Sequence, residues 1–125
     1  MAQQQGRGSA MAAMVLLSLV VLHFELAQAA TYTVGGRDGW TFNAAAWLKG
    51  KKFKAGDKLV FKYSPSFHNV VKVSRGGYNS CSTPKGSKFF KSGKDMIKLV
   101  KGRNYFICSI VGHCQAGMKI AITAV

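Results

Sequence analysis

Acidic residues are scarce in this chain. Its 125 residues contain four Asp and Glu against 18 Lys and Arg, which gives a formal net charge of +14 at pH 7. An active site built from paired carboxylates, or from a Ser-His-Asp triad, needs acids that such a chain can hardly provide. The composition therefore argues against these classes of enzyme, and we expect a protein that is not an enzyme.

Long hydrophobic runs are also missing, apart from one near the N-terminus. Residues 11–22, MAAMVLLSLVVL, follow Arg7 and precede the small-residue motif AQA at residues 27–29. This pattern is typical of a secretory signal peptide, and the run is shorter than the roughly 20 residues that span a membrane. We expect residues 1–29 to be removed as a signal peptide, which leaves residues 30–125 as one secreted domain without a membrane anchor.

The positive charge belongs to the secreted part of the chain. Arg7 and Glu25 are the charged residues of the predicted signal peptide, and their charges cancel. Its removal therefore leaves the net charge unchanged. The basic residues are scattered, and secretion argues against nucleic acid as the partner. Two interpretations remain open: nonspecific attraction to polyanions, or steering toward an acidic partner, either an unknown redox protein or an acidic cell-wall polysaccharide.

Strand signals dominate the secreted part. In residues 55–63, alternation places Leu59, Phe61 and Tyr63 on one face and Lys58, Val60 and Lys62 on the other, as in a half-buried strand. Other strand-like segments are residues 31–34, 68–74, 96–100, 104–110 and 118–125. Six to eight short strands predict an all-β fold, a Greek-key β-sandwich or barrel.

Helical signals are few. Residues 43–50, NAAAWLKG, predict a short helix that Asn43 caps and Gly50 ends. Residues 75–95 are polar and rich in glycine, and they predict turns. We expect one or two short helices beside the strands.

The motif FICSIVGHCQAGM, residues 106–118, concentrates metal-ligand chemistry in one segment. Cys108, His113 and Met118 follow one another at intervals of five, and Cys114 stands beside His113. With Cys81, the chain has three cysteines. One disulfide can form, and one thiol is left over.

Alternating orientation suggests how the cysteines divide. If this segment is extended and His113 faces a site, Cys114 faces away from it. Cys114 is then available to bridge Cys81, and Cys108 stays reduced. On the loop-entropy model such a bridge contributes roughly 3.5 to 4 kcal/mol to stability.

A second histidine completes a possible ligand set. His68 is the other histidine of residues 30–125, and it opens a predicted strand. One thiolate, two imidazoles and a weak thioether form the ligand set of blue-copper electron-transfer sites. Taken singly, Met118 could be core filler and Cys108 an inert buried thiol, while a structural zinc site would normally use a fourth strong ligand. The combination of spacing and odd cysteine count favours copper.

Longer segments carry a family resemblance. TVGGRDGW, FKAGDKLVFKYSPSFHNVVKV, YNSCSTPKG and GKDMIKLVKGRNYFICSIVGHCQAGMKI together resemble the phytocyanins, plant blue copper proteins, and most of all their plantacyanin (basic blue protein) and chemocyanin-like subgroup. The resemblance implies a cupredoxin-like sandwich, one copper ion bound by His68, Cys108, His113 and Met118, and a disulfide between Cys81 and Cys114.

The resemblance also implies a function and a place. We expect a monomer, secreted to the plant apoplast, that transfers one electron through a type 1 copper site. Asn69, which follows His68, is a candidate for supporting the ligands. The alternative is an extracellular signalling or wall-binding module, of the kind associated with pollen-tube guidance, in which copper is secondary.

Overall fold

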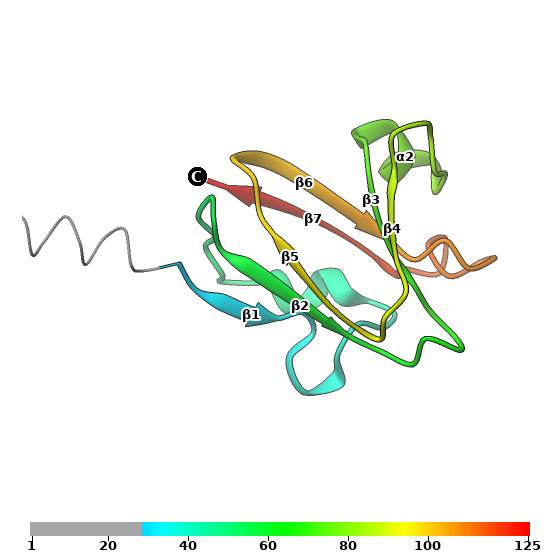
Figure 1. Ribbon diagram of the computed structural model, residues 1–125, viewed down its shortest axis with the longest axis horizontal. Coiled ribbons are helices and arrows are strands. Elements are labelled where there is room, and N and C mark those ends of the chain that lie inside the picture. The colour runs from blue at the N-terminus through cyan, green and yellow to red at the C-terminus, as the bar shows by residue number, and fades with distance from the viewer. Residues whose placement is uncertain (1–28) are drawn as a thin grey trace, which may run out of the picture.

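The computed structural model describes residues 29–125, which form two β-sheets (Figure 1). The first sheet has the order β1-β2-β5, with β1 (Thr31–Thr33), β2 (Lys58–Lys62) and β5 (Lys94–Lys98). The second has the order β4-β3-β6-β7, with β4 (Lys88–Phe90), β3 (Val70–Val73), β6 (Gly102–Ile107) and β7 (Lys119–Ala124). The predicted signal peptide lies outside the described residues, apart from Ala29, and stays a prediction.

The order of the strands is that of a sandwich. The chain builds β1 and β2 in the first sheet, moves to the second sheet for β3 and β4, returns for β5, and ends with the β6–β7 hairpin in the second sheet. Strand β1 is parallel to β2, whereas the other strand pairs are antiparallel. These seven strands of the described chain confirm the predicted all-β sandwich.

One apolar core fills the space between the sheets. Leu59 and Phe61 of β2 are fully buried and Lys58 and Lys62 are exposed, as the alternation in residues 55–63 predicts. Val60, predicted to share the exposed face of the lysines, is buried as well, so that part of the prediction is wrong. The largest buried side chains of this core come from both sheets and the connections: Trp40, Phe61, Phe106, Leu59, Leu99, Met118, Ile120 and Ile122. The second sheet also carries a smaller buried cluster on its outer face, made of Val71, Val73, Ile107 and Cys114.

The helices differ from the sequence prediction in two ways. Residues 43–50 contain a 3₁₀ helix, η2 (Ala44–Leu48), but the Asn43 side chain makes no capping hydrogen bond because its backbone is left-handed, with φ 58°. Instead the Asn43 N–H donates to the carbonyl of Gly117 at 3.1 Å. The predicted cap is therefore wrong, and Asn43 ties η2 to the loop after β6.

A helix also stands where turns were predicted. The helix α2 (Arg75–Ser80) begins at Ser74, whose hydroxyl accepts a hydrogen bond from the Gly77 N–H at 3.1 Å. A second 3₁₀ helix, η1 (Gly36–Asp38), lies between β1 and Trp40. None of the helices within residues 29–125 combines the length and apolar character needed to cross a bilayer.

Candidate metal centre

Three of the predicted ligands come from different parts of the second sheet. His68 precedes β3, and its N–H donates to the carbonyl of Ser64 at 3.0 Å, which fixes the turn before the strand. Cys108 follows β6 directly and is fully buried. Its N–H donates to the carbonyl of Met118 at 3.0 Å, so the β6–β7 ladder extends to the cysteine. His113 lies in the loop that joins these two strands.

Hydrogen bonds hold this loop in a series of tight turns. The His113 N–H donates to the Ile110 carbonyl at 3.0 Å, and the His113 carbonyl accepts from the Met118 N–H at 3.0 Å. The loop is thus not extended. The alternation of side chains along a strand, which we predicted from the sequence, is therefore not what separates His113 from Cys114. In a helical turn, successive side chains diverge by about 100°, and this separates His113 from Cys114.

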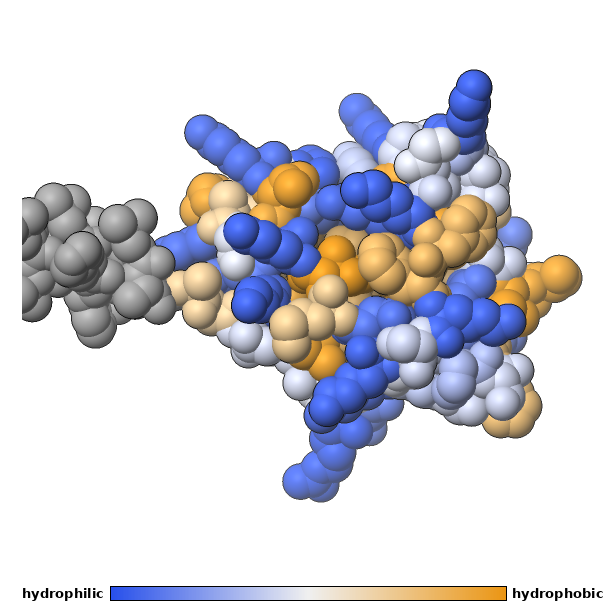
Figure 2. All heavy atoms as spheres, viewed as in Figure 1, coloured by the Kyte–Doolittle hydropathy of each residue, from blue (hydrophilic) through white to orange (hydrophobic). Residues whose placement is uncertain are grey.

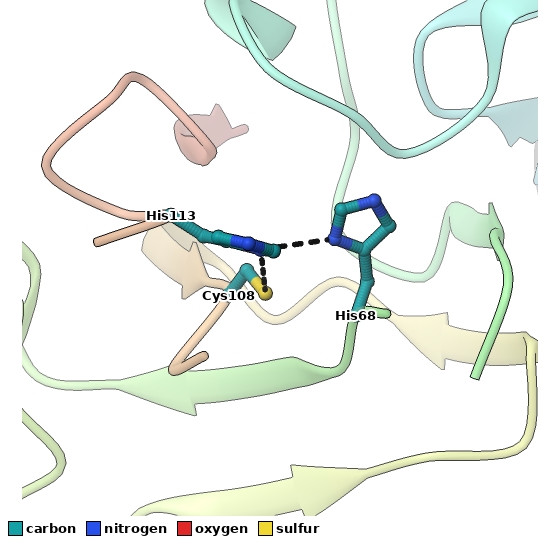
Figure 3. Close-up of side chains that lie close together, drawn as sticks. All are labelled: His68, Cys108 and His113. Atoms are coloured by element: carbon teal, nitrogen blue, oxygen red, sulfur yellow. Dashed lines mark hydrogen bonds between the residues drawn. The ribbon is translucent and has the colours of Figure 1, made fainter. Parts of the chain in front are cut away.

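The side chains of His68, Cys108 and His113 converge (Figure 3). The Nδ1 atoms of the two histidines are 3.1 Å apart, and Cys108 Sγ lies 3.6 Å from His113 Nδ1. All three ligand atoms lie within 4.8 Å of one another. Three ligands around one metal ion, with bonds of about 2.0 to 2.3 Å, stand about 3.5 to 4 Å apart. The cluster therefore fits a single metal ion.

The chemistry of the donors selects among metals. Two imidazoles and a thiol converge without any carboxylate, a combination of borderline nitrogen and soft sulfur that suits copper. Burial and the neighbouring His113 both lower the pKa of His68, burial being the larger effect. A lowered pKa keeps the imidazole neutral, as a metal ligand must be.

Met118 lies at the base of the same loop. It is fully buried and belongs to the same apolar cluster as Cys108. The main-chain hydrogen bond between them sets the two residues side by side across the β6–β7 ladder. The ligands predicted from the sequence thus come from one loop, including both of its ends, and from the start of β3.

Comparison with known proteins agrees with this geometry. Residues 40–118 match the family model of the plastocyanin-like domain. The chain belongs to this plastocyanin-like family. It is 56% identical to the chemocyanin of Lilium longiflorum, over 96% of this chain and 98% of that protein, and 54% identical to a basic blue protein of Arabidopsis thaliana, over 97% and 98%.

A solved structure extends the likeness to three dimensions. The cucumber basic protein, a blue copper protein, superposes with a TM-score of 0.74 at 59% identity, covering 76% of this chain and 99% of that one. The predicted resemblance to phytocyanins of the basic blue type is confirmed.

Asn69 braces the site of this plastocyanin-like domain. Its side chain donates to Ser109 Oγ and accepts from the Ser109 N–H, each at 2.8 Å. Its carbonyl accepts from Trp40 Nε1 at 2.9 Å. Because Asn69 follows His68 and Ser109 follows Cys108, these bonds lock two ligand-bearing segments together, as the predicted supporting role requires.

The disulfide lies on the other side of the loop. Cys81 and Cys114 are bonded, with Cα atoms 5.7 Å apart, and Cys108 is the free cysteine. Cys81 ends α2 in a left-handed conformation, with φ 52°. The bond therefore fastens the residue next to His113 to the helix, and the predicted pairing is confirmed.

Phe42 is a site residue that sequence reasoning missed. Its ring lies edge-on to both histidines, with centroids 5.9 Å from His68 and 5.1 Å from His113. No local pattern distinguishes this phenylalanine, because the contact joins segments far apart in the sequence. Trp40 is fully buried in the core, and its indole also donates the hydrogen bond to the Asn69 carbonyl.

Proposed function

We propose that this protein is a one-electron carrier whose resident metal is a single copper ion held by His68, Cys108, His113 and Met118. The observation that carries the proposal is the convergence of two imidazole nitrogens and one thiol sulfur within 4.8 Å. Copper bound to such a set takes up and releases one electron. With four protein ligands no position is left open for a substrate, which favours a carrier over an enzyme.

The chain contributes a site that stays in place. Cys108 is fully buried, so water is kept from its sulfur. The ladder bond between Cys108 and Met118, the loop bonds of His113 and the Asn69–Ser109 pair restrain the ligand segments. Preorganised side chains need little movement when the charge at the site changes, which is what fast electron exchange requires.

The histidines bring the site toward the surface. His68 and His113 are half-buried. Phe42, which contacts both histidines, is 41% exposed. Phe67 and Val111, which are close to the histidines in the sequence, are 67% and 95% exposed. Figure 2 shows hydrophobic surface at the end of the molecule where Figure 1 places the loop between β6 and β7. A small apolar surface beside a redox site suits the brief encounters of electron transfer.

Secretion and partner choice complete the proposal. The predicted signal peptide and the Cys81–Cys114 disulfide both support an oxidising, extracellular compartment. The net charge of +14 supports an acidic redox partner, with association rates that fall as salt rises. We place the protein in the apoplast, as a monomer.

Voltammetry of the copper-loaded protein tests the proposed function. We expect a reversible one-electron wave, and its loss in Cys108→Ser. A Lys101→Gln variant, which changes one exposed lysine, serves as the control and keeps the wave. A copper-loaded wild-type protein without any reversible wave would refute the proposal.

A further inference from the structure

A second feature of the second sheet has no part in the metal site. A cavity of about 250 Å³ opens at the edge of the sheet, between the end of β3 and the turn that leads into β4. We call it the lysine pocket. It is lined by Lys72, Val73, Ser74, Pro84, Lys85, Gly86, Ser87 and Lys88.

Positive charge converges on this pocket without a counter-charge. Lys72 and Lys88 face each other in register across β3 and β4, and Lys85 lies in the adjoining turn. Like charges placed directly opposite on neighbouring strands destabilise a sheet. Lys72 is half-buried, and burial together with Lys88 lowers its pKa.

The acids of the described chain are engaged or located elsewhere. Asp57 accepts hydrogen bonds from the N–H groups of Ala30 and Lys54. Asp95 accepts from the side chains of Tyr63 and Ser92. Asp38, the third, lies in η1 and does not line the pocket. The three lysines are therefore available to an anion from outside.

The walls of the pocket are built in advance. Pro84 packs against α2 so closely that a Cβ on Gly77 would lie 2.9 Å from Pro84 Cδ. The N–H and the hydroxyl of Ser87 both donate to the Pro84 carbonyl, at 3.1 and 2.6 Å. The disulfide holds α2 itself. Because the walls of the cavity are already ordered, a ligand that binds there costs less conformational entropy.

We propose that the lysine pocket binds a carboxylated sugar residue of an acidic extracellular polysaccharide. The cavity is larger than a bare carboxylate or sulfate ion, and its proline ring offers an apolar wall for the C–H face of a sugar. The lysine ammonium groups supply the charge for the carboxylate. This activity goes beyond the proposed electron transfer and does not depend on copper.

The other sheet provides a matched control. Lys58 and Lys98 also face each other across two antiparallel strands, β2 and β5, but both side chains are exposed and neither lines the lysine pocket. The variants Lys72→Gln/Lys88→Gln and Lys58→Gln/Lys98→Gln change the net charge equally. A difference between them reports the pocket and not the overall charge.

Calorimetric titration of the copper-loaded protein with trigalacturonate, at about 0.15 M salt, tests the proposal. Because K72Q/K88Q removes two charged hydrogen-bond donors for the carboxylate, we expect it to weaken binding by at least about tenfold. K58Q/K98Q should change the Kd less than about threefold, and K72R/K88R should keep most of the affinity. The methyl-esterified trisaccharide should not bind.

Four results would overturn it. They are equal losses in the two glutamine variants, no binding of trigalacturonate, equal binding of its methyl ester, or tighter binding of a hexaglutamate peptide at the same lysines. The visible spectrum and thermal unfolding of each variant confirm that copper loading and folding are intact. If K72Q/K88Q does not fold, K72R/K88R and competition by hexaglutamate still decide between the outcomes.

Discussion

The two faces of the second sheet use cysteine in opposite ways. On the inner face, toward the core between the sheets, Cys108 is a buried free thiol beside two histidines. On the outer face, Cys114 packs with Val71 and Ile107 and is bonded to Cys81 beneath α2. Cysteine is therefore a ligand on the inner face and an anchor on the outer face. The backbone lies between the sulfur of Cys108 and the sulfur of Cys114 and keeps the two apart.

The difference shows how one short loop serves two purposes. Residues 108–118 carry Cys108, His113 and Met118 on the side of the site, and Cys114 on the side of the helix. Anchoring from the outer face restrains the loop without using any ligand atom. The two faces should therefore respond independently to mutation, one in metal binding and the other in stability.

The largest expected effect is the loss of the copper centre in Cys108→Ser. The variant lacks the thiolate, so copper titration should give none of the intense visible absorption of the wild-type protein. The metal-free variant should still fold, with its free energy of unfolding lower by about 1 to 3 kcal/mol, because a hydroxyl replaces a buried thiol. Circular dichroism checks the fold, and an undiminished visible band in this variant would show that Cys108 is not a ligand.

The next effect belongs to the outer face. The double variant Cys81→Ala/Cys114→Ala removes a disulfide with a sequence separation of 33, and its free energy of unfolding should fall by roughly 3.5 to 4 kcal/mol. Urea denaturation of the metal-free protein measures this. At saturating copper the folded variant should keep the visible band, and a folded but colourless variant would mean that the two faces are not independent.

Much of this arrangement can be predicted from the sequence. Alternation in residues 55–63 identifies β2 and its core-facing Leu59 and Phe61, but it does not predict that Val60 on the opposite face is buried too. Donor chemistry and spacing identify Cys108, His113 and Met118 as ligand candidates. His68 follows because it is the other histidine of the described chain.

The features that could not be predicted depend on contacts between distant segments. Helix α2 contains Gly76 and Gly77, which are poor helix formers, and it forms because Ser74 caps it and Cys81 fastens its end. Asn43 looks like a helix cap, but its left-handed backbone serves the contact with Gly117.

A smaller effect is expected between the ligand segments. Asn69→Ala removes both side-chain hydrogen bonds to Ser109 and should lower the free energy of unfolding by about 1 to 3 kcal/mol. Ser109→Ala removes only the bond to Oγ and should cost less. Denaturation of both metal-free variants measures this order, and a Ser109→Ala effect equal to that of Asn69→Ala would contradict the bracing role of the main-chain bond.

The smallest effect is expected at Tyr63, which follows β2 in the first sheet. Burial, followed by the hydrogen bond to Asp95, raises the pKa of Tyr63 to about 12. Because the folded state holds the phenol proton more tightly than the unfolded state does, this stabilisation is present below pH 10 and is lost between about pH 10 and 12.

Absorbance titration of the phenolates, compared between wild type and Tyr63→Phe, isolates this group. The variant should lack one late-titrating tyrosine and lose less stability above pH 10. Its copper spectrum at pH 7 should match the wild type. Titration of the same group near pH 10 in the folded wild type would contradict the assignment.

Visible and EPR spectroscopy of the copper-loaded wild-type protein tests most directly whether His68, Cys108, His113 and Met118 hold one copper ion. The structure predicts strong visible absorption and an EPR signal for one Cu(II) per chain, both of which disappear on one-electron reduction, while Cys108 is protected from thiol reagents. A colourless copper-loaded protein in which Cys108 still titrates as a thiol would contradict this assignment.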